Sequence, residues 1–159
     1  TRRSQLVVAL STREDEYQGE EDFELAVSVA ASVAASAMRD GKDVTLITSR
    51  EVFAEPTPMR LLDRLSAVER ESTVPGVERL GRSVATKTPG ASVVTFITGA
   101  ATEMTRLNAA SVRVPVTARA VGLRATPGTK LARHMIGDFA SIDVPDLVSL
   151  RMAVRSVSS

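Results

Sequence analysis

The feature that most constrains the fold is a regular alternation of short apolar runs with longer segments of helical periodicity. Near-continuous apolar runs rich in β-branched residues are typical of strands that are buried on both faces of a parallel sheet. The clearest runs are QLVVAL (residues 5–10), DVTLIT (43–48) and SVVTFIT (92–98). Helices between such strands cover both faces. The alternation therefore predicts a Rossmann-like α/β domain with three layers and a doubly wound, mostly parallel sheet.

The remaining elements follow from the same kind of pattern. We expect helices over residues 22–39, from residue 58, from residue 77, over 102–110 and over 144–157, and further strands over 51–54, 117–123 and 133–136. Gly41 is expected to cap the carboxyl end of the first long helix. The buried face of the second helix is expected to consist of the apolar residues at helical spacing, Met59, Leu62, Leu65 and Val68.

The 159 residues have the length of one domain, so we expect a single domain over residues 1–159. The chain begins with a threonine and enters a strand within six residues, which leads us to expect a domain excised from a longer protein. Its longest apolar stretch, residues 25–38, has 14 residues including three serines. A membrane span needs about 20 apolar residues, so we expect this piece itself to be soluble.

The composition removes most catalytic groups. The chain has no cysteine and one histidine, His134, which excludes thiol nucleophiles, cysteine-based metal sites and multi-histidine metal sites. His134 has no carboxylate near it in the sequence before Asp138, so we interpret it as a surface or partly buried residue and not as a general base. The turn after the first strand has no glycine until Gly19, which argues against a dinucleotide site. We expect neither an enzyme nor a cofactor.

The charge is balanced overall but unevenly distributed. A net charge of +1, without a basic run that contains aromatic residues, argues against a nucleic-acid partner. Residues 1–56 carry six basic against eleven acidic residues, and residues 57–159 carry 14 against eight. Seven of the acids lie between residues 14 and 24. Two interpretations stay open: a solvated loop with an acidic first helical turn, or an electronegative rim that docks a partner or attracts a cation.

Two local motifs resemble the von Willebrand factor type A domain. They are the strand LVVAL (6–10) leading into STRED, and the segment SVVTFITGA (92–100). In that fold the first strand ends in Asp-x-Ser-x-Ser and a later strand ends in a Thr-Asp-Gly-like turn. Together with a threonine from a middle loop, these oxygens hold a divalent cation such as Mg²⁺ or Ca²⁺.

A longer segment, FELAVSVAASVAASAMRDGKDVTLITS (23–49), is similar to one uncharacterised bacterial family of von Willebrand factor A-like proteins. This family is usually encoded beside MoxR-type AAA ATPases. Its strand-end DTR-like turn corresponds here to residues 11–13, and its PGASVV entry to the later strand corresponds to residues 89–94. The resemblance covers nearly the whole chain. Upstream of this part, family members carry basic and aromatic residues and often membrane helices.

Carried over position by position, the cation site is degenerate. Ser11 stands at the position of the aspartate, Arg13 at the first serine and Asp15 at the second. Thr98 is followed by Gly99 where the second aspartate is expected. Two carboxylates are missing and a guanidinium takes one ligand position, which opposes a dication.

The resemblance therefore implies a non-enzymatic protein-interaction module that lacks its metal and works with a MoxR-type AAA ATPase. The expected binding residues are Ser11, Arg13, Glu14, Asp15, Thr98 and Gly99, as a docking rim at the strand ends. The implied location is the cytoplasm, with the full-length protein attached to the inner face of the membrane. The alternative is a divalent-cation-dependent ligand-binding or adhesion domain that uses a reshaped acidic site.

Overall fold

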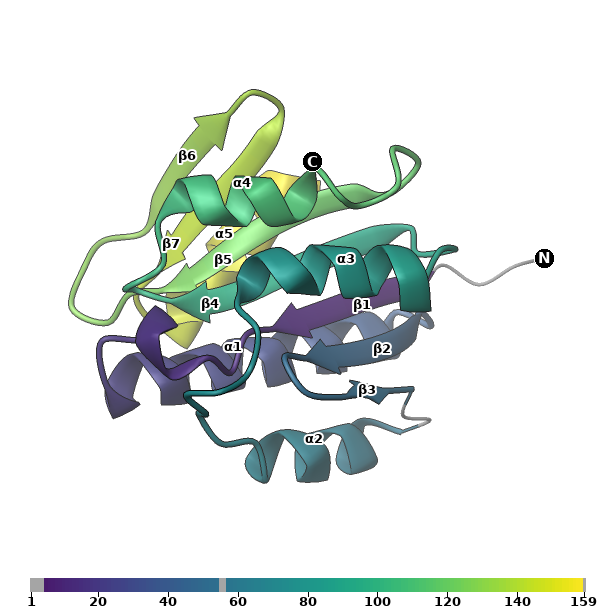
Figure 1. Cartoon of the computed structure of the whole chain (residues 1–159), viewed down its shortest axis with the longest axis horizontal. Coiled ribbons are helices and arrows are strands. Elements are labelled where there is room, and N and C mark those ends of the chain that lie inside the picture. Colours follow the sequence, from purple (N-terminus) through teal and green to yellow (C-terminus); the bar gives the residue numbers. More distant parts are fainter. Residues whose placement is uncertain (1–4, 55–56, 159) are drawn as a thin grey trace.

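The computed structural model describes residues 5–54 and 57–158, with side chains to residue 152. One sheet contains seven strands in the order β3-β2-β1-β4-β5-β7-β6 (Figure 1). Strands β1, β2, β4, β5 and β7 are parallel, while the edge strands β3 and β6 pair antiparallel with their neighbours. The strand bounds are β1 Gln5–Leu10, β2 Asp43–Thr48, β3 Val52–Phe53, β4 Val93–Gly99, β5 Arg119–Ala125, β6 Ala132–Ile136 and β7 Phe139–Val144.

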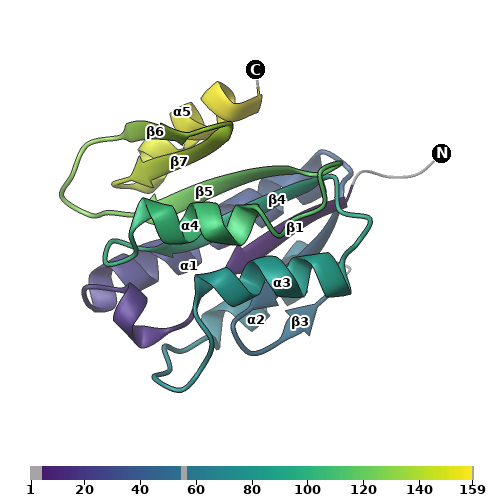
Figure 2. The same cartoon turned by 45° about the horizontal axis from the view of Figure 1, so that its top comes forward.

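Helices cover both faces of this sheet, which confirms the predicted three-layer α/β architecture. Helices α3 and α4 lie on one face, and α1, α2 and α5 lie on the other (Figures 1 and 2). The helix bounds are α1 Glu20–Arg39, α2 Pro58–Ser66, α3 Val77–Lys87, α4 Met104–Ser111 and α5 Leu147–Ser158, with a short 3₁₀ turn, η1, at Glu14–Glu16.

Each face of the sheet has its own apolar core, because the strand side chains alternate between the two helical layers. Phe96 and Leu107 are central on the α3–α4 face. Leu10 and Leu46 are central on the α1 face, under a helix whose buried side is mostly alanine and valine. The small side chains let α1 lie close to the strands.

The carboxyl end of α1 is capped as expected. Gly41 has a positive φ of 79°, which glycine adopts at little steric cost. Its amide donates to the Met38 carbonyl at 3.0 Å, and the amide of Lys42 donates to the Ala37 carbonyl at 3.0 Å. This pair of hydrogen bonds is a Schellman motif, and it turns the chain directly into β2.

The sequence analysis predicts no helix or strand over residues 139–143, whereas the structure has strand β7 there. Its sequence, FASIDV, places Ser141 and Asp143 among apolar residues and so does not read as a continuous apolar run. The strand forms because Gly137, with a positive φ of 58°, turns the chain tightly after β6, and because β5 offers a free parallel edge. The final helix consequently begins three residues later than predicted.

The structure buries a different face of α2 from the one that the sequence predicted. Leu61 and Leu65 are the buried residues of this helix, whereas the Met59 side chain is 74% exposed and Leu62 is 45% exposed. Pro58 at the first helical position fixes the start of the helix, and the Thr57 hydroxyl accepts a hydrogen bond from the Arg60 amide. The face that is buried is therefore set by how α2 docks on α1.

Among the described helices, none combines the length and the apolar character that a membrane crossing requires.

Candidate functional site at the carboxyl edge of the sheet

The carboxyl ends of β1 and β4 meet at the topological switch point of the sheet. From β1 the chain continues to β2 on one side, and β4 pairs with β1 on the other. Ligands of open α/β sheets bind in the crevice at this point. Here the segment after β1 folds back into the crevice: η1 brings Glu16 and Tyr17 under the strand ends, and both side chains are buried.

Glu16 is the central residue of this arrangement, with a carboxylate that is fully buried. Its Oε1 accepts a short hydrogen bond from the Ser11 hydroxyl and a longer one, 3.5 Å, from the Thr98 hydroxyl. Its Oε2 accepts from the Val77 amide at 3.0 Å and from the Arg106 guanidinium. A buried carboxylate is tolerated only when it is paired and hydrogen-bonded, and both oxygens meet that condition.

Arg106 reaches this carboxylate from α4 and also binds Glu78 on α3. Its Nε donates to Glu78 Oε2 at 2.8 Å and its Nη2 to Glu78 Oε1 at 2.9 Å. The hydrogen bond from Arg106 lowers the pKa of Glu78, and the reciprocal bond raises the pKa of Arg106, with further help from the charge of Glu16. The guanidinium is therefore a fixed positive charge between two carboxylates from different elements.

Val77 is the first residue of α3, so its amide is one of the free donors at a helix start. The positive end of the α3 dipole adds to the stabilisation of the Glu16 carboxylate. Gly76, immediately before it, leaves the space that this arrangement needs: an added Cβ would lie 2.7 Å from Arg106 Nη2 and 2.8 Å from Glu16 Oε2.

Tyr17 is buried in the crevice next to Glu16. Its hydroxyl donates to the Ser11 carbonyl at 2.6 Å, and its ring packs edge-on against Phe23 with centroids 5.0 Å apart. Burial raises the pKa of Tyr17 well above its usual value, and the neighbouring charges of Glu16 and Asp22 add to this. Tyr17 is therefore a neutral hydrogen-bond donor within the fold.

Gly99 at the end of β4 is required by this packing. A Cβ there would lie 2.2 Å from Tyr17 Cδ1 and 2.6 Å from the Glu16 carbonyl oxygen. The position where the resemblance expects an aspartate thus has no room for any side chain while Tyr17 is in place.

Two further polar residues tie the β4 end to the folded-back segment. The Thr102 hydroxyl donates to the Glu16 carbonyl at 3.2 Å and lies 2.7 Å from the Thr98 hydroxyl. Asp22, in the first turn of α1, accepts from the Gln18 amide at 2.7 Å, the Gly19 amide at 2.9 Å and the Ala100 amide at 3.1 Å. The carboxyl edge is consequently held together by side chains from η1, α1, β4 and α4.

The predicted docking residues divide into two layers. Ser11, Thr98 and Gly99 are buried. Glu14 and Asp15 are exposed above them and Arg13 is partly exposed. We call this surface, formed by Arg13, Glu14 and Asp15 over the three buried residues, the carboxyl-edge rim. Its role in binding stays a prediction.

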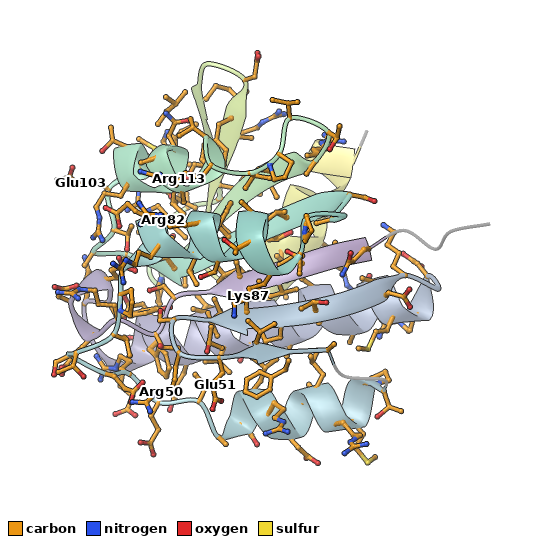
Figure 3. The ribbon with its side chains drawn as sticks, turned by 45° about the vertical axis from the view of Figure 1, so that its right-hand side comes forward. Arg50, Glu51, Arg82, Lys87, Glu103 and Arg113 are labelled. Atoms are coloured by element: carbon orange, nitrogen blue, oxygen red, sulfur yellow. The ribbon has the colours of Figure 1, made fainter. Side chains whose placement is uncertain are left out.

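Arg13 anchors the rim to the loop between α2 and α3. Its Nε donates to Asp15 Oδ1 at 2.9 Å and its Nη1 to the Val74 carbonyl at 2.8 Å. The same loop pairs with the segment after β1 through Glu71, whose amide donates to the Thr12 carbonyl at 2.9 Å. The Glu71 carboxylate accepts from Arg50 Nε at 3.0 Å, and Figure 3 shows where Arg50 lies. The loop thus meets the β1 end through backbone groups and ion pairs.

Of the seven acids between residues 14 and 24, Glu16 and Asp22 are buried and the others are exposed. The acidic first helical turn is present in α1 and includes Asp22, whereas the interpretation of the preceding loop as solvated was wrong for Glu16. Of the five exposed acids, Glu14 and Asp15 belong to the rim, and Glu20, Glu21 and Glu24 lie on α1.

The donor set at the crevice does not fit a hard dication. The buried carboxylate of Glu16 is taken by the Arg106 guanidinium, and Gly99 supplies no oxygen from a side chain. Among the residues that the structure describes, no group of three or more acidic or histidine side chains is placed to hold a metal ion.

Sequence reasoning missed Tyr17 and Arg106 as parts of this site, and it treated Glu16 as an exposed acid like Glu14 and Asp15, whereas Glu16 is buried. Glu16 is one of several acids in a row, and Arg106 lies 90 positions away from it. A signal was present in Gly99, because a glycine at a buried strand end often marks the close approach of another segment.

His134 also has a carboxylate partner that the sequence did not indicate. Its Nε2 lies 3.2 Å from Asp143 Oδ2 on the missed strand β7, and Arg124 Nη1 lies 3.4 Å from the other oxygen of Asp143. The pair follows from the antiparallel register of β6 and β7, in which Ala132 faces Asp143 and His134 faces Ser141.

In comparisons with known proteins, no family model matches this chain and no curated protein matches it. The structure itself shows the fold: a seven-stranded, mostly parallel α/β sheet with helices on both faces. This fold is consistent with a Rossmann-like or von Willebrand factor A-like architecture.

Proposed function

We propose that this domain is a non-enzymatic protein-interaction module of the von Willebrand factor A-like kind, with a degenerate metal site, and that it binds its partner through the carboxyl-edge rim. One observation carries the proposal. The crevice in which such folds bind small ligands is filled by Glu16 and Tyr17, and the Glu16 charge is neutralised internally by Arg106. We therefore assign partner binding to the rim above the crevice, although a smaller pocket of about 310 Å³, lined by Thr12, Thr48 and Arg50 among others, lies beside it at the ends of β1 and β2.

The rim suits a protein partner because its charges are held in place. Arg13 is fixed by Asp15 and by the Val74 carbonyl, and η1 is fixed from below by the buried Glu16. Charged groups of this kind steer association and select partners. The partner class rests on the sequence resemblance alone: a MoxR-type AAA ATPase, met at the inner face of the membrane.

The test is association of the domain with the neighbouring MoxR-type ATPase, measured by biolayer interferometry with and without nucleotide. The double variant Glu14→Lys and Asp15→Lys is expected to slow association about tenfold, the scale of electrostatic steering. Glu16 is left unchanged because its reversal would place a cation in a buried site built for an anion.

The matched control is Asp63→Lys, an exposed acid on α2 away from the rim. If the rim variant binds as fast and as tightly as the control, the rim is removed from the proposal. If binding appears only when Mg²⁺ or Ca²⁺ is added, the cation-dependent alternative replaces it.

A further inference from the structure

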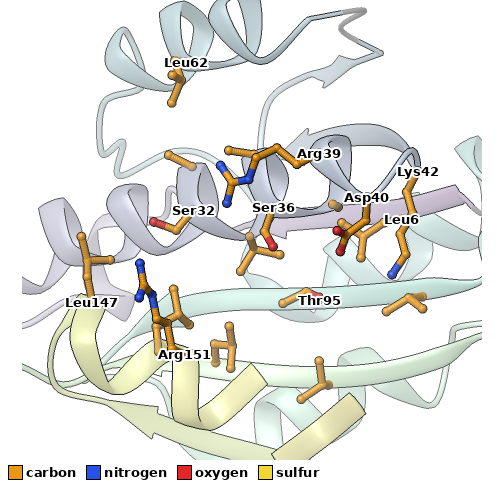
Figure 4. Close-up of a pocket in the computed structure, with 18 of the residues that line it drawn as sticks. Leu6, Ser32, Ser36, Arg39, Asp40, Lys42, Leu62, Thr95, Leu147 and Arg151 are labelled. Carbon is orange, nitrogen blue, oxygen red and sulfur yellow. The ribbon is translucent and has the colours of Figure 1, made fainter. Parts of the chain in front are cut away.

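A groove lies on the α1 face of the sheet, away from the carboxyl-edge rim. It runs between α1 and α5 over the amino-terminal parts of the central strands, with a volume of about 940 Å³ (Figure 4). Pockets for small molecules have volumes of about 300–1,000 Å³. The groove therefore has the size of a ligand site.

The floor and the walls of the groove are mostly apolar. The floor consists of strand residues, Leu6, Val93, Thr95, Val121 and Leu123. On one wall α1 presents small side chains such as Ser32 and Ser36, and on the other α5 presents Leu147 and Leu150. Because α1 has no charged residue over residues 25–38, the wall that it forms offers no ionic contact along its length.

Positive charge is gathered at the margin of this apolar groove. The groove is lined by Arg39 at the end of α1, Lys42 in the following turn and Arg151 on α5 (Figure 4). Arg119 of β5 also belongs to the lining. The single acidic residue in the lining is Asp40. The groove thus combines an apolar interior with a strongly basic margin.

The basic residues of the described chain differ in whether a carboxylate neutralises them. Arg13, Arg50, Arg106 and Arg124 each form an ion pair with a carboxylate. Within residues 5–54 and 57–152, by contrast, no ion pair joins Arg39, Lys42 or Arg151 to a carboxylate. These three charges come from different elements and line the same groove, Arg39 and Arg151 towards one end and Lys42 towards the other (Figure 4).

We infer that the groove binds a single-chain amphiphile with an anionic head group. The hydrocarbon chain lies on the strand floor between α1 and α5, and the carboxylate or phosphate is held by Arg39 and Arg151, while Lys42 adds positive charge at the other end of the groove (Figure 4). Burial of the chain supplies most of the affinity, since each buried methylene contributes about 0.8 kcal/mol. The cations select the head group by charge-assisted hydrogen bonds. This inference is independent of the proposed docking at the rim.

The experiment is isothermal titration calorimetry of the domain with laurate and with dodecyl phosphate, each below its critical micelle concentration. Dodecylamine and monolaurin serve as the cationic and neutral probes. We expect saturable binding of both anions at one site per chain, and weaker or no binding of the other two. Comparison of laurate with dodecyl phosphate distinguishes a fatty-acid ligand from a phosphorylated one.

The variant Arg39→Glu with Arg151→Glu is expected to weaken laurate binding at least about tenfold, because two charge-assisted contacts become repulsive. Ser36→Phe is expected to abolish it by filling the groove. The matched control is Arg82→Glu, an exposed arginine on the α3 side of the molecule (Figure 3), which should bind laurate like the unchanged domain. Circular dichroism verifies that each variant folds.

A second measurement uses the unchanged domain and does not depend on any variant. Laurate is expected to shift the methyl resonances of Val93 and Val121 on the groove floor, and to leave those of Val84 in α3 in place. The inference is overturned if neither anion binds, if dodecylamine binds as tightly as laurate, or if Arg82→Glu loses as much affinity as the groove variant. It is also overturned if sedimentation shows a dimer that the groove variant dissociates, which would assign the groove to a second copy of the chain.

Discussion

Replacement of Arg106 by methionine tests whether the internal ion pair holds the carboxyl edge together. Methionine keeps much of the apolar stem of arginine and removes the guanidinium, so packing changes little. Glu16 stays fully buried and loses the one charged group that contacts it within the described part of the chain. Loss of one partner of a buried pair costs about 3–5 kcal/mol, because the remaining charge is left uncompensated.

The structure places the expected loss at the lower end of this range, about 3 kcal/mol. Glu16 keeps its hydrogen bonds from the Val77 amide and the Ser11 hydroxyl. The Arg106 side chain is itself 31% exposed, so water can replace part of its contact with Glu16. Both features reduce the penalty without removing it.

The assay is urea unfolding followed by far-ultraviolet circular dichroism, with the free energy obtained by linear extrapolation. Tyr17 is the sole tyrosine and the chain has no tryptophan, so tyrosine fluorescence reports on the crevice itself. The double variant Glu16→Gln with Arg106→Met removes the buried charge as well as its partner. The free energy of unfolding that the double variant loses is expected to be smaller than the sum of the losses of the two single variants, by at least about 1 kcal/mol.

The matched control is Arg82→Met, which alters an exposed arginine with no buried partner among the described residues. If Arg106→Met loses less than about 1 kcal/mol, or no more than this control, the buried charge of Glu16 does not depend on Arg106 and the reasoning fails. Additivity of the two single variants would refute the coupling.

Three further predictions follow from the same edge of the sheet. Gly99→Ala is expected to lower the free energy of unfolding in urea by about 3 kcal/mol, because the new methyl group overlaps the Tyr17 ring and a backbone oxygen. The control is Gly90→Ala, whose added methyl group meets no atom closer than 3.8 Å. Equal losses for the two variants would contradict the packing argument. The lowered pKa of Glu78 in the folded state means that its contribution to stability is present above its unfolded pKa, about 4.3, and is lost as the pH falls through the folded value. Glu78→Gln should therefore flatten the decline of the urea midpoint between about pH 5 and pH 3, and an unchanged slope would show that the Arg106 contact does not matter. Asp22→Ala removes three hydrogen bonds from backbone amides and is expected to lower stability by about 2 kcal/mol, against a change within about 0.5 kcal/mol for the exposed Glu21→Ala on the same turn; a loss no larger than that of Glu21→Ala would contradict the capping role.

The strands that could be predicted from the sequence are those that helices bury on both faces. Strands β1, β2 and β4 read as apolar runs because helices cover both of their sides, and each was predicted within one residue of its observed bounds. Strand β7 was missed because Ser141 and Asp143 interrupt its apolar pattern. The Asp143 carboxylate contacts Arg124 and His134 on the neighbouring strands, and no local sequence pattern indicates these contacts.

The candidate site, like the fold, could be predicted from the sequence only in part. The degenerate ligand pattern, with Ser11, Arg13 and Gly99 in place of the expected residues, was visible in the sequence. The sequence could not indicate that Glu16 turns inward while Glu14 and Asp15 remain exposed, since all three are equivalent by residue type. The direction of each side chain depends on the 3₁₀ turn and on donors from β4, α3 and α4.

By itself, the sequence determined the layered α/β architecture, the capping of α1 by Gly41, and the absence of thiol and multi-histidine chemistry. These properties depend on residue identity and on short-range periodicity, which are local. Only the tertiary structure decided which acid is buried, that Arg106 neutralises it, that Tyr17 leaves room for glycine alone at position 99, and that basic side chains line an apolar groove. Those properties depend on groups far apart in the chain, and whether a charge is stable in the interior is decided by the partners that the fold brings to it.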